Sequence, residues 1–312
     1  MSAEVLPRSG IDGRGESSAA TRSFPGIRAA WRLTAPYLML LKLRIVLLLE
    51  VVALTSAVVA AGGAAPASRL SLLLLSGALA SAGASALNHY LDRDIDALMR
   101  RTRLRPLPAG KIKSPKWAAA FGLALLLASV PASLPLGLIV TTTLLLGALF
   151  YVVVYTWWLK RRTHLNVVIG GAAGSFAALA GWAAVDPSFS PLAVWVAAML
   201  FLWTPLHFWN LALVTAEDYR RAGVPMLPVV MGARRTRQYI AASAVVLVFF
   251  SLLPWALGYL GGIYVICAAA LSCLILGNLR RKGYPAQAWT NYKLSGLYLM
   301  GMLVAMILDV SV

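Results

Sequence analysis

Three oxygen-bearing side chains are evenly spaced where a long apolar segment of the sequence ends. The segment NHYLDRDID places Asn88, Asp92 and Asp96 at intervals of four residues. With about 3.6 residues per turn, these positions lie on one face of an α-helix. Unpaired carboxylates are costly at the edge of a membrane, and Mg²⁺ prefers oxygen ligands, usually together with a phosphate. The spacing therefore indicates a cation site; the alternative is a solvated helix end whose carboxylates pair with Arg100 or Arg101.

A second acidic group lies in the segment EDYRRAGVPMLP. Glu217 and Asp218 again follow an apolar stretch, with Tyr219, Arg220 and Arg221 beside them. A single Asp at this position would complete a two-sided acidic cavity with the first motif. The alternative is a set of ordinary salt bridges within the loop, which contribute little to stability.

Basic residues gather in the same polar connections as the acidic motifs. They are Lys42 and Arg44, then Arg101, Arg103 and Arg105, and finally Lys160, Arg161 and Arg162. Arginine and lysine bind phosphate oxygens strongly, and arginine does so with a specific bidentate geometry. Acidic residues flanked by these cations predict a site for Mg²⁺ and a diphosphate. Anchoring at the membrane surface and contact with anionic lipid account for many of the same basic residues.

Two further ionisable residues stand inside apolar stretches. His207, in TPLHFWN, is a candidate base or haem-iron ligand, since an intramembrane His is a functional candidate by default. The alternative is a His hydrogen-bonded to a neighbouring backbone group. Glu50 must face the interior of a helix bundle or be protonated, and the sequence indicates no role for it.

The elements that position these residues are apolar helices. Of the 312 residues, 60% are hydrophobic and 12% are charged, whereas a soluble domain has about 25% charged residues. Nine apolar stretches approach the roughly 20 residues needed to cross a bilayer. They are residues 45–63, 70–88, 116–134, 137–158, 165–184, 191–213, 238–258, 261–279 and 290–311. The sequence therefore predicts an all-α, nine-helix integral membrane protein.

The distribution of charge predicts the orientation of these helices. Every Lys and Arg except Arg69 falls in alternate connections, and the remaining connections are nearly uncharged. Because positive residues stay on the cytoplasmic side, we expect a cytoplasmic N-terminus and an external C-terminus. The same placement argues against nucleic acid as the partner, despite a formal net charge of +17.

The polar N-terminal segment is expected to lie outside the bundle. We predict that residues 1–35 form a disordered cytoplasmic tail and residues 36–312 the transmembrane domain. A mitochondrial transit peptide is the alternative, and the acidic Glu4, Asp12 and Glu16 weigh against it. Cys267 and Cys273 lie on different faces of one predicted helix, so we expect neither a disulfide nor a metal site there.

Four segments together resemble the UbiA-type intramembrane prenyltransferases. NHYLDRDIDALMRRTRLRPLPAGKI is similar to their first Asp-rich motif, N-x-x-x-D-x-x-x-D. LLKLRIVLLLEV, YTWWLKRRTHLNVVIGGAAGSFAALAGWAAV and PLHFWNLALVTAEDYRRAGVPMLPVVMG agree in order and spacing, over residues 36–310. HFW and DYRRAGVPMLPV resemble the branch of haem O synthases. Quinone-directed relatives usually carry two Asp residues four apart in the second motif, whereas this chain keeps Asp218 alone. The family often has Pro where this chain has Leu43, which bears on where the local helix starts.

The resemblance implies a bundle of nine transmembrane helices around a cavity open to lipid, and a role for each candidate residue. Asn88, Asp92 and Asp96 would hold Mg²⁺, with Asp218 opposite, and Asp92, Asp96, Asp218 and His207 would be the catalytic residues. The expected diphosphate contacts are Lys42, Arg44, Arg101, Arg105, Lys160, Arg161 and Arg221. The expected acceptor contacts are His207, Asn166 and Tyr219.

The implied reaction transfers a farnesyl group from farnesyl diphosphate to the vinyl group of haem B, giving haem O. The resemblance also implies a multi-pass protein of the bacterial cytoplasmic membrane that contacts membrane lipid. Haem A synthase would act downstream of it. Haem as acceptor rests on the resemblance alone, and the alternative within the same chemistry is a quinone-precursor aromatic acceptor. A transporter that binds a coupling cation is the alternative of another class. Such sites usually lie near the bilayer midplane, unlike the motif here.

Overall fold

The computed structural model describes residues 25–279 and 286–312. By its internal contacts the chain divides into two units, residues 1–35 and 36–312. Residues 1–24 of the predicted tail lie outside the described residues, and residues 25–35 belong to helix α1 (Pro25–Leu40). The second unit contains every residue predicted to bind metal, diphosphate or acceptor.

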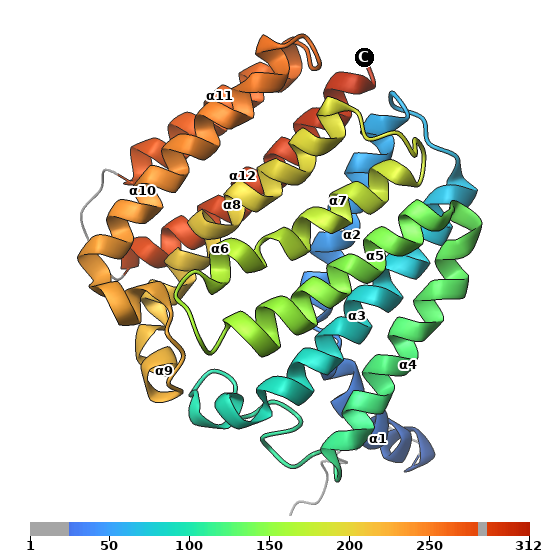
Figure 1. The fold of residues 1–312 in the computed structure, drawn as a ribbon, viewed down its shortest axis with the longest axis vertical. Helices are drawn as coiled ribbons and strands as arrows, with labels where there is room; N and C mark the ends of the chain where they lie inside the picture. The colour runs from blue at the N-terminus through green and yellow to red at the C-terminus, as the bar shows by residue number, and fades with distance from the viewer. Residues whose placement is uncertain (1–24, 280–285) are drawn as a thin grey trace, which may run out of the picture. The chain divides into compact units, whose positions relative to one another are not determined.

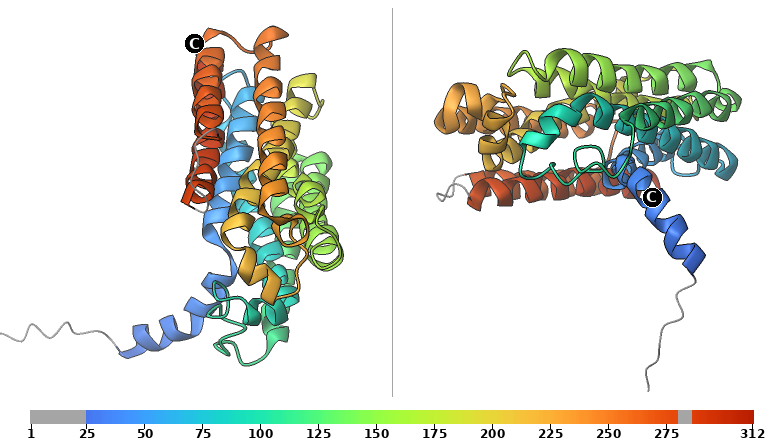
Figure 2. Two further views of the ribbon diagram at one scale, coloured as in Figure 1. Left: turned by 90° about the vertical axis from the view of Figure 1, so that its left-hand side faces the viewer. Right: turned by 90° about the horizontal axis from the view of Figure 1, so that it is seen from below.

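Within the described ranges all regular structure is helical, and nine segments are long and apolar enough to cross a membrane. They are α2 (Leu43–Ala60), α3 (Ala67–Leu98), α4 (Pro115–Ser133) with η1 (Leu134–Leu136), α5 (Leu138–Leu149) with η2 (Phe150–Leu159), α6 (Asn166–Gly170) with α7 (Ala172–Ala183), α8 (Pro191–Val214), α10 (Leu227–Ala256), α11 (Gly262–Leu279) and α12 (Ala286–Val310). Figures 1 and 2 show them side by side in the second unit. The predicted all-α, nine-helix membrane bundle is confirmed.

Two helices extend well beyond the predicted apolar stretches. Helix α3 continues to Leu98, so the whole Asp motif is helical. Helix α10 begins at Leu227, inside the segment predicted to be a connection, and bends at Gly232, where φ is 75°. Only glycine adopts this conformation readily. The same connection also contains the short helix α9 (Ala216–Arg221). Hydropathy marks the membrane-buried part of a helix and therefore misses polar turns that continue past it.

A close backbone contact fixes α3 against α4. A Cβ atom on Gly83 would lie 2.7 Å from the Gly122 carbonyl oxygen, and one on Gly122 would lie 2.9 Å from the Gly83 carbonyl oxygen. Small residues allow helices to approach this closely in a membrane. Two residues further along α3, the Ser85 hydroxyl donates to the Leu40 carbonyl at 2.7 Å. These contacts hold α3 just before the Asp motif begins.

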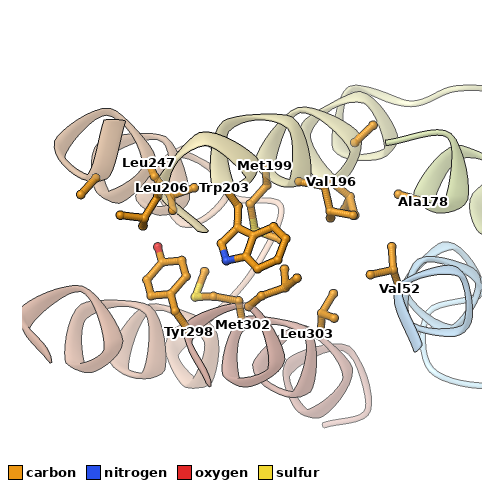
Figure 3. Packing of buried hydrophobic residues seen from close by; sticks show 14 of the residues in the cluster. Val52, Ala178, Val196, Met199, Trp203, Leu206, Leu247, Tyr298, Met302 and Leu303 are labelled. Carbon is orange, nitrogen blue, oxygen red and sulfur yellow. The ribbon is translucent and has the colours of Figure 1, made fainter. Parts of the chain in front are cut away.

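Helices α8 and α12 pack through the largest buried hydrophobic cluster. Trp203 of α8 points toward Met302 and Leu303 of α12, and Met199 and Leu206 flank it on α8 (Figure 3). Its indole nitrogen also donates to the carbonyl oxygen of Ser295 at 2.7 Å. This bond fixes the position of α8 along α12, one helical turn before His207.

The polar segments gather at one end of the bundle. The end of α3, the loop of residues 99–114, the loop after η2 and helix α9 lie together there, and the short uncharged connections lie at the other end (Figure 1). This arrangement places the two acidic motifs at the same end.

Candidate functional site

Asn88, Asp92 and Asp96 form a buried ladder along one face of α3. Their exposed fractions are 2%, 0% and 2%. The Asn88 amide donates to Asp92 Oδ2 at 2.9 Å. Protein encloses the three side chains, so they are not the solvated helix end that was the alternative.

Both carboxylates of the ladder are paired with a cation from another part of the chain. Arg105, in the loop after α3, donates to Asp96 Oδ1 at 2.9 Å and Oδ2 at 2.7 Å. Lys160, which follows η2, donates to Asp92 Oδ2. Although burial opposes it, the Asp92 carboxylate raises the pKa of Lys160. Each carboxylate therefore has a counter-ion that could turn to an anionic ligand.

Lys42 reaches the same ladder from the start of α2. Its ammonium group donates to Asn88 Oδ1 and to the Tyr151 hydroxyl, at 3.2 Å in the second case. Lys42 has a left-handed backbone with φ 48° and ψ 54°, and α2 begins at the next residue, Leu43. The helix thus starts without the Pro that the family often has there. Burial, with the nearby charges of Arg105 and Lys160, lowers the pKa of Lys42 to about 7.

A π-helix, η2, supplies the remaining polar walls of the site. Its wider turn is visible in the bond from the Lys160 amide to the Tyr155 carbonyl, five residues back, at 2.9 Å. Thr156 donates to the Tyr151 carbonyl at 2.8 Å and accepts from the Asn88 amide at 2.9 Å. The rings of Tyr151 and Tyr155 stack with centroids 5.8 Å apart. Such segments are frequent at functional sites.

The ladder fits a divalent metal ion bound together with a phosphate. Asp92 Oδ1 is buried and has no hydrogen-bond partner among the described residues. An unsatisfied buried carboxylate oxygen is costly, so a cation is its natural partner. No three His, Cys, Asp or Glu side chains in the described ranges are close enough to enclose a metal by themselves. The two carboxylates of the ladder suit Mg²⁺, which is usually bound by one or two carboxylates, waters and substrate phosphate.

Asp218, on α9, contacts the backbone of the loop that follows α3. Its two carboxylate oxygens accept from the amides of Arg100 and Arg101, at 3.1 and 3.3 Å. The second acidic motif therefore holds the loop that carries Arg105. The ion pairs predicted as the alternative are also present nearby, because Arg220 and Arg221 both bond to Glu217.

The structure does not bring all the predicted cations to the ladder. Arg161 binds both oxygens of Asp94, at 2.6 and 2.7 Å, on the side of α3 away from the ladder. Arg44 and Arg101 have exposed side chains, and Arg221 is engaged by Glu217. Lys42, Arg105 and Lys160 are the predicted cations that contact the ladder.

His207 lies in an aromatic setting between α8 and α12. Its ring is stacked on Trp203 and packed against Tyr292, each with centroids 4.3 Å apart. Its Nδ1 atom lies 2.8 Å from the Ser295 hydroxyl. These contacts are with α8 and α12 rather than with α3, so His207 belongs to another wall of the bundle than the ladder.

Asn166 and Tyr219, the other predicted acceptor contacts, are buried. Asn166 opens α6, donates to the Thr163 carbonyl at 2.6 Å, and has an Oδ1 atom without a partner among the described residues. Tyr219 is 8% exposed and close enough to Lys160 to interact electrostatically with it. Tyr219 therefore stands beside the ladder.

The sequence profile of the UbiA prenyltransferase family matches residues 49–299, which is most of the chain. The chain belongs to the UbiA prenyltransferase family. It is 45% identical to Protoheme IX farnesyltransferase 1 of Paramagnetospirillum magneticum, over 88% of this chain and 97% of that protein. It is 40% identical to Protoheme IX farnesyltransferase of Granulibacter bethesdensis, over 91% of this chain and 92% of that protein.

A solved structure of the family has the same fold. It is a UbiA homolog from Archaeoglobus fulgidus bound to DMAPP and Mg²⁺, with a TM-score of 0.60 and 20% identity, covering 86% of this chain and 98% of that one. At that identity the likeness concerns the fold alone.

Sequence reasoning missed three groups that the structure places at the ladder. Thr156 bonds to the Asn88 amide, and the Tyr151 hydroxyl bonds to Lys42. His89 lies near the three cations that contact the ladder. No signal in the sequence marks Thr156 and Tyr151, because the ten residues of η2 are almost uniformly apolar and show no periodicity. His89 could have been found, since it follows Asn88 directly in the motif.

Proposed function

We propose that this protein transfers the farnesyl group of farnesyl diphosphate to a vinyl group of haem B, giving haem O. The observation that carries the diphosphate part is the buried ladder, in which Asn88, Asp92 and Asp96 each face a cation from a different segment. The identity of the acceptor rests on relatives that are named protohaem IX farnesyltransferases and that this chain matches over nearly their whole length.

The arrangement suits a site that binds a cation and an anion together. A bound Mg²⁺ would be held by Asn88, Asp92 and Asp96, and it would neutralise charge on the departing diphosphate. Lys160 and Arg105 now neutralise the two carboxylates. When the carboxylates turn to the metal, both cations become available for phosphate oxygens. In this arrangement the carboxylates freed by one ligand and the cations freed by the other would make the binding of each favour the binding of the other.

The site positions the bond that breaks. The C1–O bond of the farnesyl donor breaks with its electron pair going to the diphosphate, where Lys42, Arg105 and Lys160 stabilise the growing negative charge. The allylic carbon becomes cationic, and the aromatic rings of Tyr151 and Tyr155 beside the ladder would favour that positive charge. The vinyl group of haem B attacks this carbon, and water adds to the resulting cation and loses a proton. The product carries a hydroxyethylfarnesyl substituent.

His207, with Asn166 and Tyr219, is the proposed acceptor wall. Trp203 supports the ring of His207 from the core, and the half-buried ring of Tyr292 beside His207 offers a flat apolar surface suited to a porphyrin edge. Iron ligation by His207 would fix the distance of the vinyl group from the donor. Asp218 is assigned a positioning role through its bonds to the loop of Arg105.

We also propose an orientation and a location. The chain lies in the bacterial cytoplasmic membrane, and its N-terminus is cytoplasmic because every Lys and Arg except Arg69 falls in alternate connections of the sequence. Residues 36–312 are then the catalytic domain and residues 1–35 a cytoplasmic tail. Farnesyl diphosphate approaches from the cytoplasmic side, and haem O leaves for haem A synthase.

The decisive test is a reaction of the purified full chain with farnesyl diphosphate, haem B and Mg²⁺, followed by mass spectrometry of the extracted haem. We expect a haem enlarged by one farnesyl group and one hydroxyl group, with an equal amount of diphosphate released. Farnesylation of an aromatic acid instead of haem would establish the quinone-precursor alternative. Absence of diphosphate release with every acceptor would refute the enzyme and favour a transporter.

A further inference from the structure

His89 is a buried polar side chain at the ladder for which the proposed mechanism has no use. It is 2% exposed, and neither ring nitrogen has a hydrogen-bond partner among the described residues. Leaving a buried polar group unsatisfied is costly, and the loss is recovered when a ligand supplies the partner. The position of His89 decides which ligand that is.

The helix geometry places His89 on the face of the ladder. At about 100° per residue, His89 lies about 20° from Asp96 and about 60° from Asp92 around the axis of α3. Along the axis it lies about 4.5 Å further into the membrane than Asp92. His89 therefore stands at the inner end of the ladder, on the side from which the prenyl chain of a diphosphate bound at the ladder would extend into the membrane.

The charges around His89 identify an anion as its partner. Lys42, Arg105 and Lys160 are all close enough to interact electrostatically with the ring. Unlike the carboxylates of the ladder, the ring brings no negative charge to hold a metal ion against these three cations, whereas a diphosphate oxygen would be attracted by them. Mg²⁺ also prefers oxygen ligands to imidazole.

We propose that His89 donates a hydrogen bond from a ring nitrogen to an oxygen of the prenyl diphosphate, on the side of the bond that breaks. This inference rests on the proposed function, because it assumes that the ladder binds a prenyl diphosphate. The imidazole keeps its proton, and the bond strengthens as the leaving oxygen gains charge. His89 is thus a further substrate-binding residue rather than a metal ligand.

The test compares two variants of the purified full chain. His89→Leu removes the donor, while His89→Gln keeps an N–H on a side chain of similar reach. The probe is farnesyl thiolodiphosphate, an analogue that is hard to cleave, titrated by calorimetry with Mg²⁺ present. Loss of a hydrogen bond to a charged group predicts that His89→Leu binds the analogue about 10- to 100-fold more weakly. His89→Gln should bind more tightly than His89→Leu.

A second titration separates substrate binding from metal binding. Mn²⁺ affinity without diphosphate, measured by electron paramagnetic resonance, should be unchanged in both variants. Equal binding of the analogue by wild type and His89→Leu would overturn the inference, as would a parallel loss of Mn²⁺ affinity. If the wild type itself does not bind the analogue, the proposed function fails and takes this inference with it.

A measurement on wild-type protein covers the case in which His89→Leu does not fold. The chain has three His residues, so the ring signals of ¹⁵N-histidine-labelled protein are few. The signal that disappears in His89→Gln should shift when the analogue and Mg²⁺ are added. A signal that stays in place would refute the contact.

Discussion

Replacing Lys160 by Met is predicted to move metal and diphosphate affinity in opposite directions. The Lys160 ammonium group is buried against Asp92, whose other oxygen has no partner among the described residues. A metal ion must compete with this ammonium for Asp92, and a diphosphate must attract it. Lys160→Met removes the competitor and the phosphate contact together, so the metal binds more tightly and the diphosphate more weakly.

The magnitudes follow from the burial of the pair. A lost hydrogen bond between an ammonium and a phosphate costs about 1.5–3 kcal/mol, which is about 10- to 100-fold in affinity for the diphosphate. Removing one partner of a buried ion pair costs about 3–5 kcal/mol of folding stability when nothing replaces it. Added metal ion replaces it, so Mn²⁺ should raise the melting temperature of Lys160→Met by more than that of the wild type.

The assay titrates Mn²⁺ into the full chain without diphosphate, then titrates farnesyl thiolodiphosphate at saturating Mg²⁺. Lys116→Met is the matched control, because Lys116 is exposed at the start of α4 and lies outside the site. It should leave both affinities unchanged. A Mn²⁺ affinity that is unchanged or weaker in Lys160→Met would refute the competition for Asp92, whatever happens to the diphosphate.

Further substitutions compare residues on the ladder with close neighbours outside it. In an assay of diphosphate release, Asp92→Asn should lower turnover by more than about 100-fold because the metal loses a buried charged ligand. Asp94→Asn breaks only the exposed pair with Arg161, so its turnover should stay close to that of the wild type. Arg105→Met should raise the Michaelis constant for farnesyl diphosphate about 10-fold or more, and Arg161→Met should change it by less than about threefold; equal effects would show that the pairing with Asp94 does not persist during turnover. His207→Ala should reduce haem farnesylation far more than binding of the diphosphate analogue, and full activity in that variant would remove the acceptor role.

The helices and the ladder are local properties of the sequence, and the sequence alone predicted them. A run of about 20 apolar residues satisfies its own backbone hydrogen bonds in lipid only as a helix. The spacing of Asn88, Asp92 and Asp96 then follows from the helical repeat, whatever the rest of the chain does. The resemblance to the family added a substrate but did not place a side chain.

The partners of the ladder depend on contacts between segments far apart in the chain, and only the tertiary structure decided them. Lys160 and Arg161 are neighbours in sequence, yet the π-helical turn before them directs Lys160 to Asp92 while Arg161 binds Asp94 on the other side of α3. Asp218 could equally have faced a metal, and it instead holds two backbone amides of the loop that carries Arg105. The ladder itself is determined by local geometry. Which cation pairs with each carboxylate, and whether the ring of His89 finds a hydrogen-bond partner, depend instead on which segments pack against α3.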